Sequence, residues 1–325
     1  MNIVVIGASG HVGSFLVPRL VSAGHDVTTV TRGERTPYHD DPAWDAVERI
    51  VIDREARDAD GTFGSIIATL GADVVVDLIC FTERSARQLV DGIRGKVSLL
   101  VHVGTIWVHG TPVQVPVRED DPRHPFGDYG VAKAAIERML HEETRGGGLP
   151  ATIVHPGHIS GPGWPIVNPL GNLDLGVWTA LATGERLVMP NLGLEALHHV
   201  HADDVAQLIQ LTIANPKAAA GESFHAVSER ALTMRGFAEA VAGWYGRTAD
   251  LEFVPFEQFA STTTPEFARA TWEHMIRNSA MSIEKARTLL GYEPAYGSLA
   301  AVAEAVGWLR RDGQLPNVPE IRRSS

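Results

Sequence analysis

The sequence has almost no cysteine, because Cys80 is the only one among 325 residues. A single thiol cannot form an internal disulfide, and it cannot supply the several thiolates of a zinc or iron–sulfur site. Long apolar runs are missing too. The apolar stretch at the N-terminus has the length of one strand, follows no basic segment, and is far too short to span a membrane. We therefore expect a cytoplasmic protein without a membrane segment.

Basic residues are also fewer than acidic ones. The chain carries 28 Lys and Arg against 39 Asp and Glu, for a formal net charge of −11. This balance disfavours nucleic acids and anionic membranes as main partners, because both are polyanions. The nearest approach to a basic block is Arg322-Arg323, which we interpret as a solvated tail. The length fits one large α/β domain or two coupled ones, with no internal repeat or low-complexity linker.

The chain begins with a strand-like segment and a glycine-rich turn. Residues 3–6 are apolar on both faces, which is typical of a strand in a parallel sheet. Gly7 then allows a tight turn, Gly10 lets the backbone approach a pyrophosphate, and Gly13 lets the next helix pack closely on the strand. The amides at the start of that helix would bind the phosphates. A β–α turn without a ligand stays an alternative, but the strand before and the helix after favour a dinucleotide.

The end of the second expected strand bears on which dinucleotide is bound. NAD sites commonly place an acidic side chain there to bond the ribose 2′-hydroxyl, whereas an arginine accommodates a 2′-phosphate. This sequence has Thr31 and Arg32 at that point. We therefore predict NADP as the cofactor, with NAD as the alternative. An exposed loop arginine without a ligand is the other interpretation of Arg32.

Strand and helix patterns alternate through the first half of the chain. The expected strands are 3–6, 27–31, 50–53, 72–80, 97–103 and 151–155. The expected helices between them are 15–21, 64–70, 83–94 and 129–144. This alternation predicts an α/β fold with a Rossmann-type doubly wound parallel sheet.

The alternation is lost after residue 156, where a smaller, mixed C-terminal lobe is expected. Its helices are predicted at 175–183, 203–214, 233–246, 265–277, 282–290 and 298–311. We expect residues 1–160, with a later return segment near 196–230, to form an NADP-binding Rossmann domain. Residues 161–195 and 231–325 would then form a substrate-binding lobe. Ligands of such sheets lie outside the carboxyl ends of the strands.

Tyr129 and Lys133 are the second chemical signal. They are four residues apart in a helical stretch, so both side chains leave the same face. An ammonium near a phenol favours the phenolate and would lower the pKa of Tyr129, producing a group that can give or take a proton near neutral pH. A surface Tyr–Lys pair is the alternative. The position after the fifth strand of a chain that opens with the glycine turn favours the catalytic interpretation.

Together these motifs resemble the extended short-chain dehydrogenase/reductase family, which includes the NAD-dependent epimerases and dehydratases. The glycine spacing and the Tyr-x-x-x-Lys pair match that family. Residues 104–110 resemble its Ser-Ser-x-x-Val-Tyr-Gly segment, which puts Thr105 in the position of the catalytic hydroxyl. Residues 200–206 and 282–294 resemble its His-Val-x-Asp segment and its near-terminal helix. The resemblance covers nearly the whole chain.

The resemblance implies a role for each motif residue. Tyr129 would be the general acid/base, Lys133 would hold the nicotinamide ribose, and Thr105 would bond the substrate oxygen. The glycine motif and the resemblance together imply this cofactor-binding set: Gly7, Ser9, Gly10, His11, Val12, Gly13, Arg32, Asp53, Leu78, Ile79, Cys80, Gly104, Lys133, Pro156 and Gly157.

The departures from the family pattern narrow the chemistry. Residues 106–107 replace the acidic pair that dehydratases carry, which disfavours dehydration. Leu197 stands where nucleotide-sugar enzymes have an arginine, and His155 and His158 stand in place of an arginine and an asparagine. The Arg-Pro-Gly-Asp segment is replaced at 277–280. Without those cations a diphosphate would lose charge-assisted bonds, so a UDP- or dTDP-sugar is disfavoured.

Aromatic side chains and histidines provide the remaining candidates. Those expected to contact the substrate are Trp107, His109, His158 and Trp164, whereas core packing explains Trp178 equally well. His198, His199 and His201 form a cluster, but no carboxylate or thiolate stands at ligand spacing from them. We expect no metal site.

These observations lead to one main hypothesis and two alternatives. The chain is expected to be an NAD(P)-dependent oxidoreductase that passes a hydride between the nicotinamide and a secondary alcohol or ketone, sugars included, with Tyr129 moving the proton. The nearest alternative is a sugar epimerase whose bound cofactor is transiently reduced. A non-catalytic dinucleotide-sensing protein is the alternative of another class, disfavoured because a sensor needs only the glycine turn. The resemblance also implies a homodimer formed through the helix that bears Tyr129.

Overall fold

The central sheet of the computed structural model is built around its first strand. β1 (Asn2–Ile6) lies between two parallel neighbours, β2 (Asp26–Thr31) and β4 (Val74–Asp77). Seven parallel strands run in the order β11-β6-β5-β4-β1-β2-β3. The structure describes residues 1–321, so the tail Arg322-Arg323 lies outside the described residues.

The remaining strands and the helices of this lobe alternate along the chain. The strands are β3 (Glu48–Val51), β5 (Leu99–Val103), β6 (Ala151–Pro156) and β11 (Ser223–Ala226). The α-helices are α1 (His11–Ser22), α2 (Arg54–Asp60), α3 (Phe63–Ala68), α4 (Glu83–Ile93), α5 (Gly127–Arg145), α7 (Ala202–Ala214), α8 (Pro216–Ala219) and α12 (Glu284–Leu290). Short 3₁₀ turns are η1 (Pro42–Asp45) and η2 (Ile106–His109). The predicted doubly wound parallel sheet is confirmed.

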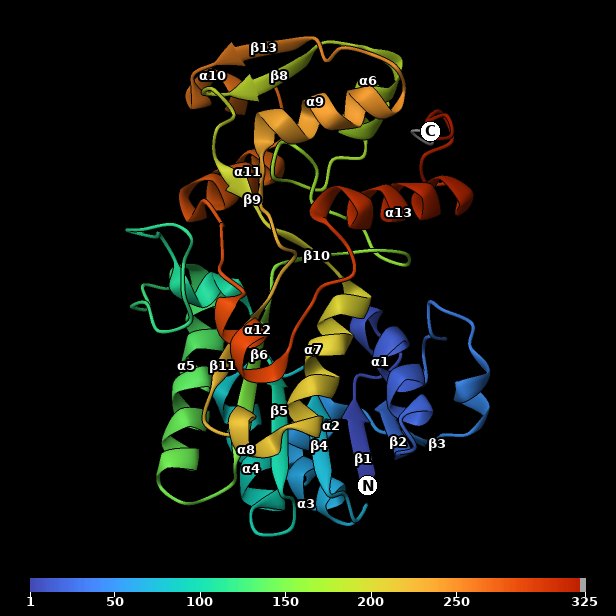
Figure 1. Cartoon of the computed structure of the whole chain (residues 1–325), viewed down its shortest axis with the longest axis vertical. Coiled ribbons are helices and arrows are strands. Elements are labelled where there is room, and N and C mark those ends of the chain that lie inside the picture. The colour runs from blue at the N-terminus through green and yellow to red at the C-terminus, as the bar shows by residue number, and fades with distance from the viewer. Residues whose placement is uncertain (322–325) are drawn as a thin grey trace.

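Both faces of the sheet are buried, which explains the continuous apolar character of β1. Ile3 and Val5 pack into a core with α1 and α7. Val4 and Ile6, which alternate with them, pack into a second core with α3, α4 and α5. Helices therefore cover both faces, as Figure 1 shows.

Residues 48–60 differ from the prediction. The third strand ends at Val51, not at Asp53, because Asp53 caps α2 and its carboxylate accepts a hydrogen bond from the Ala56 amide at 3.2 Å. Helix α2 was not predicted, since its sequence Arg-Glu-Ala-Arg-Asp-Ala-Asp has no apolar stripe of helical period. The fourth strand is also shorter than predicted, β4 covering Val74–Asp77.

A second lobe lies above the carboxyl ends of the strands in Figure 1. Its strands are β7 (His158–Ser160), β8 (Leu187–Pro190), β9 (Ala196–Leu197), β10 (His199–His201), β12 (Leu232–Thr233) and β13 (Leu251–Val254). Its helices are α6 (Gly176–Thr183), α9 (Met234–Trp244), α10 (Phe256–Ala260), α11 (Pro265–Arg277) and α13 (Ser298–Arg311). It has its own apolar core, in which the structure places Trp178. No helix within residues 1–321 is long and apolar enough to cross a membrane.

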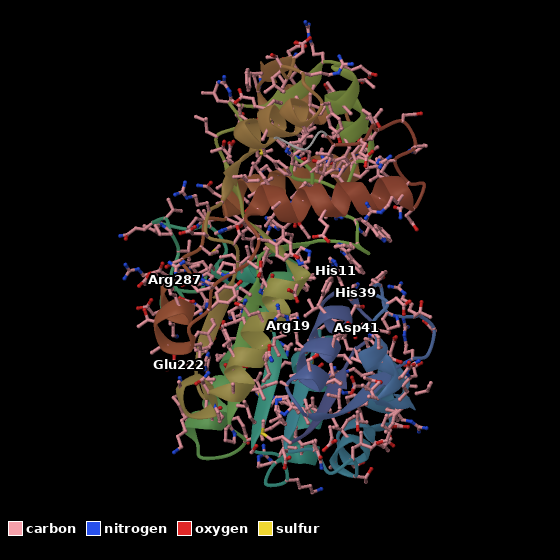
Figure 2. The ribbon with its side chains drawn as sticks, turned by 45° about the vertical axis from the view of Figure 1, so that its right-hand side comes forward. His11, Arg19, His39, Asp41, Glu222 and Arg287 are labelled. Carbon is pink, nitrogen blue, oxygen red and sulfur yellow. The ribbon has the colours of Figure 1, made fainter. Side chains whose placement is uncertain are left out.

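An ion pair and a close helix crossing hold the flanking layers in place. On one face, Arg19 of α1 reaches Asp203 of α7 with two bonds of 2.6 Å, and Figure 2 shows Arg19 between those helices. On the other face, α3 and α4 cross at Gly64 and Gly92. A Cβ on Gly92 would lie 2.2 Å from the Gly64 carbonyl carbon, and one on Gly64 would lie 2.1 Å from the Gln88 oxygen. Only glycine fits at this crossing.

The crossing predicts opposite effects for two helical glycines. Gly92→Ala will lower the free energy of unfolding by about 1–3 kcal/mol, because the new methyl must push two backbones apart. Gly243→Ala is the matched control, since a Cβ there meets nothing within 4 Å, and it will be neutral or stabilising by up to about 1 kcal/mol. Urea denaturation followed by circular dichroism measures both. Equal stability of the two variants would contradict the close crossing.

Candidate functional site

The glycine turn forms a cradle at the start of α1. Gly7 has a φ of +84°, and a Cβ there would lie 2.6 Å from Ile79. A Cβ on Gly13 would lie 2.1 Å from the Ala8 carbonyl oxygen, so the helix packs directly on the turn. Gly10 precedes the helix, and no side chain among the described residues caps its first turn. The amides of that turn are thus suited to an anionic ligand such as a pyrophosphate.

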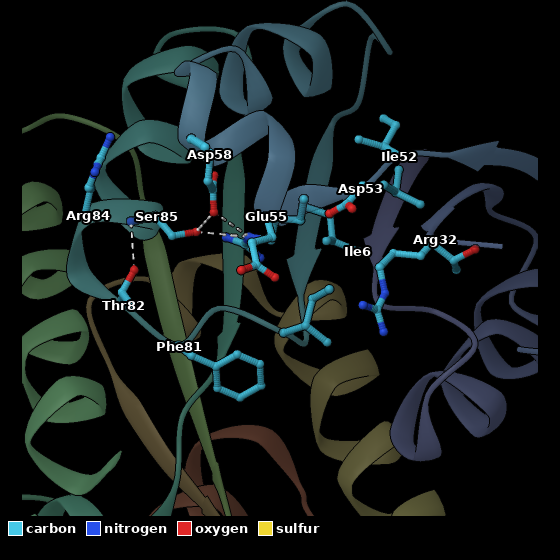
Figure 3. A pocket seen from close by; sticks show the side chains of 15 residues that line it. Ile6, Arg32, Ile52, Asp53, Glu55, Asp58, Phe81, Thr82, Arg84 and Ser85 are labelled. Carbon is cyan, nitrogen blue, oxygen red and sulfur yellow. Dashed lines mark hydrogen bonds and ion pairs between the residues drawn. The ribbon is translucent and has the colours of Figure 1, made fainter. Parts of the chain in front are cut away.

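A cavity of about 740 Å³ lies at the carboxyl ends of β1 and β2, where Ile6 and Thr31 line it. Three predicted cofactor residues, Arg32, Asp53 and Ile79, line it (Figure 3). Arg32 is exposed and pairs with Glu34 at 3.1 Å, an ion pair that water screens and a phosphate could replace. The residues present therefore fit the adenosine half of a dinucleotide.

A buried ion pair stiffens the far wall of this cavity. Nη1 of Arg54 lies 2.6 Å from the Asp77 carboxylate at the end of β4, and Nε bonds Ser85 at 3.0 Å. Burial alone would raise the pKa of Asp77, but the Arg54 guanidinium lowers it, so the carboxylate stays ionised. The sequence did not identify Arg54 as part of this site, because its partners Asp77 and Ser85 lie on β4 and α4, far from it along the chain.

Lys133 is fully inside the protein, although the helix that carries it is amphipathic. It is 2 % exposed, and its Nζ donates to the carbonyl oxygens of Cys80 at 2.8 Å and Val103 at 2.7 Å. Burial lowers its pKa to about 8. Two of the three ammonium donors are used in this way, which leaves one for a ligand.

Tyr129 and Thr105 meet in front of that lysine. The Thr105 hydroxyl lies near the Tyr129 phenol, where it favours the phenolate, and Thr105 Oγ1 accepts the Trp107 amide at 3.3 Å. The predicted lowering of the Tyr129 pKa is wrong for this state of the protein. Although Tyr129 keeps 43 % of its surface exposed, burial around the phenol raises its pKa, against the opposite effect of the nearby Thr105 hydroxyl. The Lys133 ammonium, turned toward two carbonyls with Nζ 6.0 Å from the Tyr129 ring centre, does not reverse this.

Aromatic rings extend from Tyr129 into the second lobe. Trp107 packs edge-on against Tyr129 at 6.0 Å and against His274 at 5.2 Å. The His274 ring in turn packs edge-on against the His158 ring, with 4.8 Å between the ring centres. The structure thus brings two predicted substrate residues, Trp107 and His158, into one group with Tyr129.

Arg277 is a member of this group that sequence analysis did not identify as functional. Its guanidinium is sandwiched between the Trp107 ring at 3.7 Å and the Phe126 ring at 3.8 Å. Burial lowers its pKa to about 10, so it stays charged at neutral pH. No local signal identifies it, because Arg277 is about 150 residues from Phe126 in the chain.

The other two predicted substrate residues lie elsewhere. Trp164 stacks on His11 at 6.0 Å, beside the glycine turn. His109 is buried, with Nε2 2.8 Å from Nε2 of His225 and Nδ1 3.4 Å from Arg123. The histidine cluster at 198–201 is buried as well. Within residues 1–321 no three His, Cys, Asp or Glu side chains are grouped to hold a metal ion.

Most of the other predicted cofactor residues pack closely against neighbouring segments. Gly157 lies so close to the backbone of His198 that a Cβ on it would be 2.3 Å from the His198 carbonyl oxygen. A Cβ on Gly104 would be 2.4 Å from the His155 ring. Pro156 ends β6, and Leu78 packs on the core. Cys80 points its thiol into the interior and offers only its carbonyl to Lys133.

The position of Cys80 predicts its reactivity. Burial, with Asp77 adding to it, raises the pKa of the thiol to about 11. The folded protein will therefore react with a disulfide reagent such as DTNB about 100-fold more slowly than the unfolded chain at about pH 8. Absorbance of the released thiolate, with and without urea, measures both rates. Equal rates would contradict the buried position.

Comparisons with known proteins agree with this geometry. The model of the NAD dependent epimerase/dehydratase family matches residues 3–226. The 2′-dehydrokanamycin reductase of Streptomyces kanamyceticus is 27 % identical over 319 residues, covering 97 % of this chain and 86 % of the relative. The UDP-glucose 4-epimerase of Mycolicibacterium smegmatis is 25 % identical over 334 residues, covering 97 % and 100 %.

A solved structure shows the same fold. The dTDP-glucose 4,6-dehydratase of Streptomyces venezuelae, solved with NAD bound, superimposes with a TM-score of 0.71 at 20 % identity and covers 98 % of this chain and 100 % of that one. The chain therefore belongs to the NAD-dependent epimerase/dehydratase family, the extended short-chain dehydrogenase/reductase enzymes.

Proposed function

We propose that this chain is an NADP(H)-dependent oxidoreductase that interconverts a ketone and a secondary alcohol on a carbohydrate-like small molecule. The observation that carries the proposal is the grouping of the Tyr129 phenol and the Thr105 hydroxyl beside the buried Lys133, which lies one helical turn after Tyr129. A non-catalytic sensor would not need this arrangement, because the glycine turn alone suffices to bind a dinucleotide.

Each of the three residues has a defined task in the proposed reaction. When bound, the cofactor supplies or accepts a hydride at its nicotinamide ring. Tyr129 gives its phenolic proton to the ketone oxygen, or takes the alcohol proton in reverse. Thr105, whose oxygen already accepts the Trp107 amide, directs its own hydrogen toward Tyr129 or the substrate oxygen. The third Lys133 N–H would be available to hold the nicotinamide ribose.

The proposed substrate class lacks a nucleotide diphosphate. Leu197 is buried in β9, so the position that nucleotide-sugar enzymes give to an arginine offers no cation. His155 faces the interior, where its two ring nitrogens are already bonded. The similarity to a reductase named for a dehydrokanamycin substrate supports a ketone on a sugar-like ring. We propose that the second lobe, residues 161–195 and 231–325, binds this molecule.

A second candidate is 4-epimerisation of a nucleotide sugar at the same site. It is supported by the full-length similarity to a UDP-glucose 4-epimerase. A dinucleotide that stays bound through purification, and no net change in absorbance near 340 nm on turnover, would favour this candidate over net reduction (the wavelength is approximate).

Three further proposals concern the whole enzyme. Arg32 at the cavity rim favours NADP over NAD, because its guanidinium can exchange Glu34 for a 2′-phosphate. Pairing of α5 with the same helix of a second copy of the chain would make a homodimer. We also propose that the enzyme is located in the cytoplasm.

Tyr129→Phe will lower kcat by about 100- to 10,000-fold, because the proton donor is lost. The affinity for NADPH will stay nearly unchanged, since the phenol does not hold the dinucleotide. The assay follows NADPH absorbance with a panel of ketones on sugar and cyclitol rings, with UDP-glucose as the nucleotide-sugar comparison. Tyr245→Phe, remote in the second lobe, is the control and should keep full activity. Unchanged turnover by Tyr129→Phe would overturn the mechanism.

Arg32→Ala will weaken NADPH binding by about 10-fold and leave NADH binding unchanged, because one charged hydrogen-bond partner of the 2′-phosphate is removed. Fluorescence titration with both cofactors measures the two dissociation constants. Arg84→Ala is the matched control, since Arg84 lines the same cavity on the opposite side (Figure 3) and should preserve the preference. A native protein that binds NADH more tightly than NADPH would refute the choice of cofactor.

A further inference from the structure

A continuous set of buried hydrogen bonds lies behind Thr105. The Thr105 amide donates to Nδ1 of His155 at 3.0 Å. Nε2 of His155 lies 2.9 Å from Oε1 of Glu137 on α5. Two bonds from Arg123, at 2.8 and 3.0 Å, and one from the Ser223 hydroxyl at 2.8 Å hold the same carboxylate. The imidazole is thus fixed at both ends.

These contacts determine the protonation of the imidazole. A backbone N–H can only donate, so Nδ1 of His155 must be the acceptor and carry no hydrogen. The single ring hydrogen is then on Nε2 and is donated to Glu137. Burial alone would raise the pKa of Glu137, but His155, His141 and Arg123 hold the pKa of this carboxyl well below its usual range. A neutral His155 beside an ionised Glu137 satisfies every partner.

The backbone at residues 103–105 is adapted to this ring. Gly104 has no Cβ, and one there would lie 2.4 Å from Nδ1 of His155. From the other side, Lys133 holds the Val103 carbonyl at 2.7 Å. The segment that presents the Thr105 hydroxyl is therefore held between a lysine and a histidine.

We propose that His155, oriented by Glu137, is a positioning residue that fixes the Thr105 backbone so that its hydroxyl meets Tyr129 and the substrate oxygen. The inference rests on the proposed function for its catalytic consequence. The contact itself does not, because the tautomer of His155 can be observed without a substrate. His155 stands where the resembled family carries an arginine.

The device makes turnover sensitive to acid. If Nδ1 of His155 were protonated, its N–H would point at the N–H of the Thr105 backbone. The hydrogen bond that holds Thr105 would then be lost. Burial lowers the pKa of His155 although Glu137 raises it, so this loss occurs below the ordinary range of histidine. The charged or titratable groups that face His155 from the surrounding elements are Glu137, His141, Arg123, His102, His109 and His225. A variant that replaces His155 is needed to separate the titration of His155 from that of these neighbouring groups.

The experiment compares three variants of the full chain. His155→Phe keeps a ring but removes the acceptor, and will lower kcat by about 10- to 100-fold, the cost of a misplaced reacting group. NADPH affinity will not change. His155→Asn offers an amide oxygen near the Nδ1 position and will recover most of kcat. It will also lose the acid decline of the wild type, because an amide does not titrate. His25→Asn is the control, since none of these bonds involves His25.

The readouts are kcat and KM against pH, NADPH fluorescence titration, and a long-range ¹⁵N spectrum of the histidine rings. The spectrum should show His155 as the neutral Nε2–H form, its signal identified by absence in His155→Asn. An Nδ1–H form, or wild-type kcat in His155→Phe, would overturn the inference. If His155→Phe does not fold, an unchanged acid decline in His155→Asn overturns it instead. Failure of the proposed function would appear separately, as full activity of Tyr129→Phe.

Discussion

The buried ammonium of Lys133 is the interaction on which the site depends. It joins the Val103 carbonyl at the end of β5 to the Cys80 carbonyl in the segment after β4. Charged hydrogen bonds of this kind contribute about 1.5–3 kcal/mol each, and burial of the charge offsets part of that gain. The lowered Lys133 pKa reflects that cost. Lys133 thereby fixes the separation of two strand ends, between which the nicotinamide half of the dinucleotide would lie.

The two hydroxyls proposed to act in catalysis, those of Thr105 and Tyr129, depend on the same restraint. Thr105 follows Val103 by two residues, and the two are held from opposite sides by His155 and Lys133. Tyr129 is one helical turn before Lys133 on α5, and Glu137 is one turn after it. One face of this helix therefore carries the proposed acid/base, the cation that holds the strand ends, and the carboxylate that orients His155. A shift of α5 would disturb all three together.

Aromatic side chains from both lobes lie next to Tyr129. Trp107, His274 and His158 form an aromatic group next to the Arg277 guanidinium. An arginine between two rings has its faces covered and only its edge nitrogens available, two of which bond the Glu273 and Phe126 carbonyls. The Arg277 guanidinium therefore holds the Trp107 and Phe126 rings together, and its edge nitrogens are largely occupied by the protein itself.

The sequence alone determined those features that depend on near neighbours in the chain. The run of apolar residues before Gly7 predicted a strand buried on both faces, and the spacing of Tyr129 and Lys133 placed both on one helix face. Contacts between distant segments could not be predicted in this way. His155 is 50 residues from Thr105, Arg277 is 151 from Phe126, and Trp164 meets His11 across two lobes. Local pattern carries no information on such pairs, because they exist only after the sheet has brought the strand ends together. The raised Tyr129 pKa belongs to the same class, since tertiary packing decides how much water surrounds a phenol and where a nearby ammonium turns.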